Sequence, residues 1–293
     1  MVEMRRLLKG ATVFDEADIK DAVRDRYADH ATNATSCCSP SITRAGLASC
    51  CGSSDQSVSE RLGYDARDLA AIPEGADLGL GCGNPLAMLE LKEGEIVLDL
   101  GSGAGIDCFL AAKRVGSTGR VIGVDMTPEM IARARRNAAQ GGIDNVEFRL
   151  GEIEHLPVED NSIDAVISNC VINLVPDKRQ VFADVFRALK PGGRLSVSDI
   201  VTLGEIPLQI RSSVEAYVSC LSGAILRDDY LDLLTDVGFT DITARESRSF
   251  TVGDVVGDAS AAEFAQQSGA TMEEFEAAAA LFQSVRVSAR KPA

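Results

Sequence analysis

The sequence predicts an α/β fold built around a doubly wound, mostly parallel sheet, and three observations support this prediction. Short apolar runs that suit buried strands alternate with longer amphipathic runs between about residues 95 and 201. The first apolar run leads straight into the glycine-rich turn GSGAG at 101–105, where a helical pattern begins. Strands and helices that alternate in this way connect parallel neighbours through right-handed crossovers.

A helical extension is expected before the sheet. Residues 15–30 carry an apolar side chain at every fourth position, which is typical of a helix with one apolar face. From residue 31 to about 59 the chain is rich in Ser, Thr, Ala, Gly and Cys without periodicity, which indicates a long loop. The helical pattern returns at 57–72, just before Pro73. The apolar positions of the first helix are Ile19, Val23 and Tyr27.

The elements of the sheet and its covering helices follow in order from the same patterns. The helix that begins near Thr127 has a threonine N-cap, Pro128 at its first position, and a glycine pair at its end. Buried strands are expected at 95–101, 120–126, 146–151, 165–170 and 194–201. The intervening helices are expected at 105–115, 127–142 and 176–193.

An elaborated α+β region is expected after residue 202. It contains a helical segment bearing Cys220 and a second helix at 228–238. Strand patterns at 241–250 and 284–290 flank a further helical stretch and should add an antiparallel edge to the sheet. The predicted division is therefore N-terminal helices with a cysteine-rich loop at 1–75, a Rossmann-like core at 76–202, and a C-terminal region at 203–293.

The acidic composition argues against several classes of partner. A formal net charge of −15 would repel a phosphate backbone, and no run of basic residues offsets it. Neither nucleic acid nor an anionic membrane surface is therefore expected. No stretch approaches the ~18 uninterrupted apolar residues of a membrane span, and the N-terminus lacks the apolar segment of a secretory signal. We expect a cytoplasmic protein that acts on a small molecule.

Eight cysteines indicate chemistry or metal binding, because a reducing cytoplasm keeps thiols out of structural disulfides. Zinc is disfavoured, since the early cysteines come as adjacent pairs and the chain has only two histidines. These pairs are Cys37–Cys38 and Cys50–Cys51. Cys108 falls on the apolar side of its helix and is expected to be a buried core residue.

The glycine turn predicts a cofactor site at the carboxyl edge of the sheet, where the backbone can approach a ligand closely. A dinucleotide fingerprint would need a third glycine at position 106, which is isoleucine, so NAD is disfavoured. Asp125 ends the second strand, 24 residues after Gly101, and is placed to accept hydrogen bonds from ribose hydroxyls. An adenosine-containing ligand fits this pattern.

Four ordered motifs, VLDLGSGAG, GVDM, LGEIEHLP and LKPGGRL, resemble those of class I S-adenosylmethionine-dependent methyltransferases over about residues 90–200. The resemblance implies S-adenosylmethionine as the cofactor. It also implies that three residues line the amino acid end of the cofactor, that Asp125 holds the ribose, and that Asn169 lies beside the methyl group. The amino acid end would be lined by Asp99, Gly101 and Gly103, and the adenine would be contacted by Met126, Glu152 and the Ile153 backbone.

Three cysteine segments, GLGCGNP, ISNCVINL and AYVSCLSGA, extend the resemblance to the arsenite S-adenosylmethionine methyltransferases over about residues 20–230. The resemblance implies that Cys82, Cys170 and Cys220 bind trivalent arsenic, a soft and pyramidal centre that suits thiolates. The lone pair of the arsenic would attack the methyl group in line, so proximity and orientation would carry the catalysis.

The same resemblance gives the N-terminal cysteines a redox role. An N-terminal thiol would join the catalytic cysteines in a disulfide relay that reduces the methylated arsenic, with glutathione or a thioredoxin-type protein as reductant. Which of the four early cysteines takes part is left open, and Cys38 is favoured.

Three alternatives remain at this point. The acceptor could be another small molecule, the chain could be a non-catalytic thiol sensor of metalloids, or all three later cysteines could be core residues. Binding of S-adenosylmethionine separates the enzymes from the sensor, and a screen of acceptors separates the two enzymes.

Overall fold

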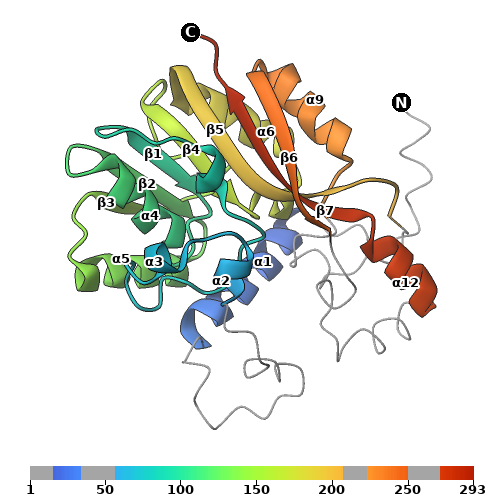
Figure 1. Cartoon of the computed structure of the whole chain (residues 1–293), viewed down its shortest axis with the longest axis horizontal. Coiled ribbons are helices and arrows are strands. Elements are labelled where there is room, and N and C mark those ends of the chain that lie inside the picture. Colours follow the sequence, from blue (N-terminus) through green and yellow to red (C-terminus); the bar gives the residue numbers. More distant parts are fainter. Residues whose placement is uncertain (1–15, 34–56, 207–222, 250–270) are drawn as a thin grey trace.

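The computed structural model describes residues 16–33, 57–206, 223–249 and 271–293 of the chain. Their central feature is one seven-stranded sheet with the strand order β3-β2-β1-β4-β5-β7-β6 (Figure 1). The first five strands are parallel, and β7 runs antiparallel to both of its neighbours. This confirms the doubly wound sheet and its antiparallel edge. The strands are β1 Ile96–Leu100, β2 Arg120–Asp125, β3 Val146–Leu150, β4 Ile163–Asn169, β5 Leu189–Thr202, β6 Thr240–Ser249 and β7 Phe282–Arg290.

Helices cover both faces of the sheet, and α1 lies across the edge where the parallel strands end (Figure 1). The longer helices are α1 Glu16–Asn33, α4 Ile106–Val115, α5 Pro128–Gly141, α6 Lys178–Ala188, α9 Arg227–Val237 and α12 Met272–Ala279. The short helices are α2 Val58–Arg61, α3 Ala66–Leu69, and the 3-10 turns η1 Pro85–Met88 and η2 Ile172–Leu174. None of the helices in the described ranges is long and apolar enough to cross a membrane.

The prediction of one helix at 57–72 is wrong. Two short helices stand there, because the backbone at Gly63 adopts a φ of 97° that a helix cannot contain. Asp65 then caps the second helix by accepting a hydrogen bond from the Arg67 N–H. This turn places Tyr64 between the two helices with its side chain buried.

The predicted helix at 176–193 ends early, at Ala188. Pro191 has no N–H to donate and disfavours the helical backbone of the residue before it. The chain therefore turns into β5 at Leu189, with a shift of register against β4 before Arg194. The predicted strand at 194–201 is thus the regular part of a longer strand.

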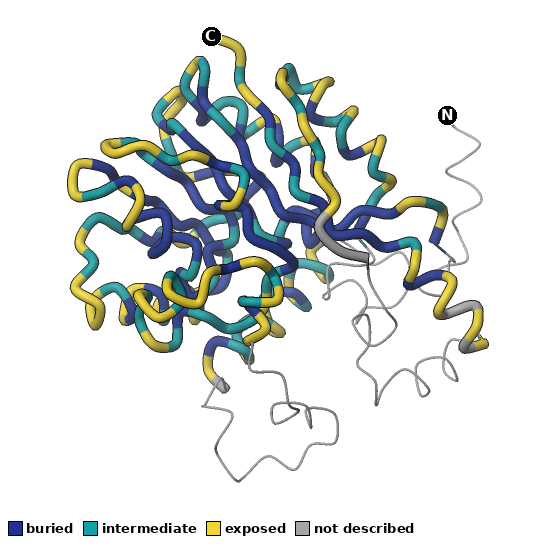
Figure 2. The backbone as a smooth tube through the Cα atoms, viewed as in Figure 1, coloured by how far each residue is buried: buried dark blue, intermediate teal, exposed yellow. Residues whose placement is uncertain are grey.

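Alternation along β1 separates two hydrophobic cores. The central strands of the sheet are buried along most of their length (Figure 2). Leu98 packs on one face with Phe182 of α6 and Tyr230 of α9. Val97 packs on the other face with Phe109 of α4 and neighbouring residues of α5. Burial on both faces explains why the strands have apolar runs instead of alternating ones.

Two glycines of the turn after β1 provide a matched test of local strain. Gly101 and Gly103 both have positive φ, at 64° and 52°. A methyl group added at Gly101 would lie 2.5 Å from Val171 Cγ2, whereas one at Gly103 would meet no described atom within 4 Å.

We expect Gly103→Ala to lower the free energy of unfolding by about 1–2 kcal/mol, the cost of a left-handed alanine. Gly101→Ala should cost about 1–3 kcal/mol more, because Val171 must also move. Urea unfolding of the ligand-free proteins measures both values, and equal losses would contradict the assigned clash.

Candidate functional site

A pocket opens at the carboxyl ends of β1, β2 and β4, the edge where ligands bind in open α/β sheets. Its empty volume of about 1090 Å³ includes the part open to solvent and is sufficient for a cofactor of nucleoside size. The wall includes seven of the residues predicted to bind the cofactor, Asp99, Gly101, Gly103, Asp125, Met126, Ile153 and Asn169.

One end of the pocket is closed by an ion-pair cluster between α1 and the segment after β3. Lys20 Nζ lies 2.8 Å from Glu152 Oε2 and 2.7 Å from Glu154 Oε1. Glu154 is buried and forms part of the pocket wall, whereas the Glu152 carboxylate is more exposed. Hydrogen bonds to Lys20 hold the pKa of Glu152 below its usual range. These contacts fasten α1 over the pocket.

Asp125 ties the end of β2 to the glycine turn. Its Oδ2 accepts a hydrogen bond from the Gly103 N–H at 2.9 Å, and its Oδ1 accepts one from the Thr127 N–H at 2.8 Å. Burial nevertheless raises the pKa of this carboxyl above its usual value. The side chain is thus held in one orientation at the pocket wall.

A second buried carboxyl, Asp107 in the first turn of α4, lies close to Asp99 in the pocket wall. Tyr64 Oη donates to Asp107 at 2.9 Å, and the Cys108 thiol donates to Asp99 Oδ2 at 3.2 Å. Burial raises the pKa of Asp107 to about 6. Burial, together with the nearby Asp107 charge, also raises the pKa of Asp99 well above its usual value. Two carboxyls that face one pocket favour a ligand with a cationic group.

Asp107 and Tyr64 were not predicted from the sequence. A charged residue within an otherwise apolar helical turn was the available signal for Asp107. Cys108 is fully buried, which confirms the prediction that it belongs to the core.

Asn169 connects these acidic groups with the segment that carries Cys82. Its Nδ2 donates to Tyr64 Oη and to the Gly83 carbonyl, each at 2.8 Å. Its Oδ1 accepts a hydrogen bond from the Cys82 N–H at 3.1 Å. One side chain at the end of β4 therefore fixes the backbone on both sides of the Cys82 thiol.

Glycines flank Cys82 because the segment packs directly against the sheet. A Cβ at Gly81 would lie 2.6 Å from Asn169 Nδ2, and one at Gly83 would collide with the Ser198 hydroxyl. Ser284 of β7 donates to the Cys82 carbonyl at 2.8 Å. The motif GLGCGNP is thus a close-packing motif that holds one thiol at the ends of β4 and β5.

Cys170 is brought to the same place by an unusual backbone conformation. Its φ of 59° is left-handed, which is rare for a residue with a side chain and often marks a functional position. Its N–H donates to the Ser198 carbonyl at 2.8 Å, while the Cys82 thiol lies 3.5 Å from that same oxygen. Both cysteines are buried, each with 7% of its surface exposed.

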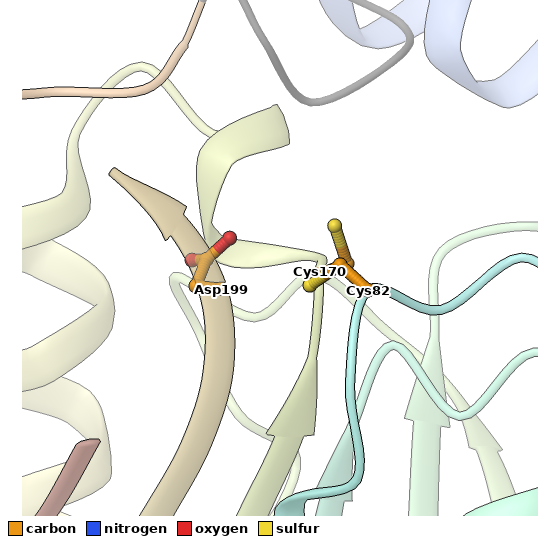
Figure 3. A group of neighbouring side chains, drawn as sticks. All are labelled: Cys82, Cys170 and Asp199. Atoms are coloured by element: carbon orange, nitrogen blue, oxygen red, sulfur yellow. The ribbon is translucent and has the colours of Figure 1, made fainter. Parts of the chain in front are cut away.

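Asp199 lies beside these two thiols (Figure 3). The sulfur atoms of Cys82 and Cys170 and one carboxylate oxygen of Asp199 all lie within 4.8 Å of one another. Burial raises the pKa of Asp199 to about 7. Two of the predicted arsenic-binding cysteines are thus close together, and the other predicted site cysteines, Cys38 and Cys220, lie outside the described residues.

Comparisons with known proteins agree with this geometry. The profile of the methyltransferase domain family matches residues 91–238. The arsenite methyltransferase of Halobacterium salinarum is 52% identical over 227 residues, which cover 77% of this chain and 58% of that protein. The arsenite methyltransferase of Mus musculus is 41% identical over 168 residues, covering 54% and 44%. The chain spans about half the length of the curated relatives it matches.

Solved structures of methyltransferases are also similar to the chain. An arsenic(III) S-adenosylmethionine methyltransferase from Chlamydomonas reinhardtii superposes with a TM-score of 0.56 at 31% identity, covering 82% of this chain and 75% of that one. A geranyl diphosphate C-methyltransferase from Streptomyces coelicolor has a TM-score of 0.55 at 22% identity, covering 70% and 76%, and indicates the shared fold alone.

The raised pKa of Asp107 predicts how stability depends on pH. The folded pKa of about 6 lies above the unfolded value near 3.9, so the folded state binds the proton more tightly. The contribution of this group to stability is complete below about pH 4 and is lost as the pH rises through 6.

Asp107→Asn should therefore gain stability relative to the unmodified protein as the pH rises from about 4 to 7, on the order of 1–3 kcal/mol. Chemical unfolding at a series of pH values measures this difference. A difference that stays constant across the range would show that Asp107 titrates normally.

Proposed function

The chain belongs to the arsenic(III) S-adenosylmethionine methyltransferase family, and we propose that it transfers methyl groups from S-adenosylmethionine to trivalent arsenic held by cysteine thiolates. The observation that carries the proposal is the convergence of two buried cysteines: Cys170 lines the pocket, and the sulfur of Cys82 lies within 4.8 Å of that of Cys170. The products would be methylated arsenicals, and the biological role would be arsenic detoxification in the cytoplasm.

The residues of the pocket fit the cofactor from end to end. When bound, S-adenosylmethionine supplies an electrophilic methyl group on a sulfonium. Asp125 would accept hydrogen bonds from the ribose, and the carboxyls of Asp99 and Asp107 would face the cationic amino acid end. Met126 and Ile153 offer apolar contact for the adenine, with Glu152 and Glu154 near its edge. Backbone approach at Gly101 and Gly103 would bring the ligand against the sheet.

The thiols would hold arsenic with its lone pair directed at the methyl group. Each thiol that bonds to arsenite replaces one hydroxide, and its proton leaves with that hydroxide as water. Cys82, Cys170 and Cys220 would complete a pyramidal set of three sulfurs, the geometry that leaves one lone pair for attack. The attacking atom carries no proton, so positioning can supply most of the rate enhancement.

A reductant completes the proposed cycle. Methyl transfer to the lone pair raises arsenic formally from the trivalent to the pentavalent state. Two protein thiols that join in a disulfide supply the two electrons that return it to the trivalent state, and we assign one of them to Cys38. Glutathione or a thioredoxin-type protein would then reduce the disulfide by thiol exchange.

The direct test is incubation of the full chain with arsenite, S-adenosylmethionine and glutathione, followed by separation of the arsenic species. Methylated arsenic that depends on both protein and cofactor supports the proposal. Tight cofactor binding without arsenic methylation would favour a methyltransferase with another acceptor.

Different cysteines should be needed for the methylation of different substrates. Cys170→Ser should lower methylation of both arsenite and methylarsenite by about 100-fold or more, because a hydroxyl is a hard and weakly acidic substitute that leaves arsenic misplaced. Cys38→Ser should lose methylation of arsenite but keep that of methylarsenite, which needs fewer protein thiols. Initial rates of methylation, measured with each substrate at a fixed glutathione concentration, test this assignment of roles.

Two results would reject this division of roles. One is a Cys170→Ser variant that keeps most of its activity on both substrates. The other is a variant with serine at Cys37, Cys38, Cys50 and Cys51 that methylates arsenite at the unmodified rate.

Asp125→Ala should weaken S-adenosylmethionine binding by about 1–3 kcal/mol, because the ribose hydroxyls lose a buried, oriented acceptor. Glu129→Ala, which removes an exposed carboxylate from the start of α5, is the matched control and should bind normally. Calorimetry gives both affinities, and an unchanged affinity in Asp125→Ala would remove this residue from the site.

A further inference from the structure

Asp199 gives the thiol site a donor that arsenic chemistry does not require. Within the ranges that the structure describes, one group of His, Cys, Asp or Glu side chains is close enough to share a metal ion, and it consists of Cys82, Cys170 and Asp199. The three side chains come from a loop, from the end of β4 and from β5, and converge on one space (Figure 3). All three are buried, with Asp199 entirely inaccessible.

The carboxylate is held in place by its own partners. Asp199 Oδ1 accepts hydrogen bonds from Asn173 Nδ2 and the Ile200 N–H, each at 2.9 Å, while Tyr230 Oη donates to Oδ2 at 3.2 Å. A carboxylate oxygen can accept more than one such contact, so Oδ2 retains capacity for a cation. Outer contacts that orient a ligand in this way are a regular feature of metal sites.

The donor set distinguishes one class of ion from another. Trivalent arsenic is soft and prefers sulfur alone, whereas zinc and the related cadmium ion accept thiolates and carboxylates together. Two thiolates and one carboxylate carry three negative charges, which a divalent cation compensates to −1 in a buried site. Three protein ligands also leave a fourth position of the tetrahedron for water or another donor.

We propose that Cys82, Cys170 and Asp199 form a binding site for a borderline divalent cation, Zn²⁺ or Cd²⁺, which competes with trivalent arsenicals for the two thiols. Each thiol that binds the cation releases its proton to the solvent. Arsenic and the cation share the sulfur atoms, but only the cation uses Asp199. Inhibition by the cation is therefore competitive with the arsenical.

The experiment compares a cation, which would bind the two sulfurs and Asp199, with an arsenical, which would bind the two sulfurs alone. Reduced full-length protein is titrated with Cd²⁺ alone, and the ultraviolet charge-transfer absorption of cadmium–thiolate bonds reports binding. The same proteins are then titrated with phenylarsine oxide, a trivalent arsenical. Cys82→Ser identifies the part of the signal that belongs to this site.

Asp199→Asn is the decisive variant, because it keeps the size of the side chain and an acceptor for its neighbours while removing the charge. We expect it to weaken the Cys82-dependent binding of Cd²⁺ by about tenfold or more and to leave the affinity for phenylarsine oxide within about twofold. Asp160→Asn removes an exposed carboxylate at the far end of β4 and should change neither affinity.

Three results would overturn the proposal: no Cd²⁺ signal that depends on Cys82, unchanged Cd²⁺ affinity in Asp199→Asn, or an equal loss of both ligands in that variant. The last result would assign Asp199 a structural role only. Cd²⁺ binding that depends on Cys82 and Asp199 in a protein that fails to bind phenylarsine oxide would support the cation site, but it would reject both the competition with arsenicals and the proposed arsenic chemistry.

Discussion

The close packing of the Cys82 segment against the ends of β4 and β5 is the constraint on which the site depends. Without side chains at positions 81 and 83, the backbone can approach Asn169 and Ser198, and the Asn169 amide then fixes it from both sides. The backbone carbonyl of Ser198 accepts a hydrogen bond from the Cys170 N–H. One strand end therefore sets the backbone position of both cysteines.

Buried polar groups at the pocket are costly unless they are paired, and three of them are paired with one another. Tyr64, Asp107 and Asn169 form a chain of hydrogen bonds between the cofactor pocket and the Cys82 segment. A chain of this kind rigidifies its members when every link is satisfied. The pocket and the Cys82 segment are consequently joined by these hydrogen bonds, and a substitution at Asp107 should alter the position of the Cys82 segment.

The sequence was sufficient to predict the parallel strands, because burial on both faces leaves apolar runs that differ clearly from helical spacing. It also located the glycine turn and the residues around it. It could not reveal that Tyr64 meets Asp107, 43 positions away, or that Asp199 lies beside Cys82. Those contacts depend on how the sheet brings strand ends together, and a polar residue inside an apolar run gives no indication of its partner. The helix predicted across Gly63 failed because one left-handed turn overrode a good periodic pattern.

The surroundings of the two thiols are assembled from segments that lie far apart in the chain. A small hydrophobic cluster joins Cys82 and Cys170 to Val23 of α1 and Phe282 of β7, and Ser284 of β7 holds the Cys82 carbonyl. The cofactor end is instead formed mainly by the turns after β1 and β2, which are consecutive parallel strands of the same sheet. The Cys82 segment therefore depends on the antiparallel strand β7, whereas no described residue of β7 lines the pocket. Both thiols precede the fifth strand in the sequence, and what the chain adds after that strand is a hydroxyl donor, Ser284 of β7, which holds the backbone carbonyl of Cys82.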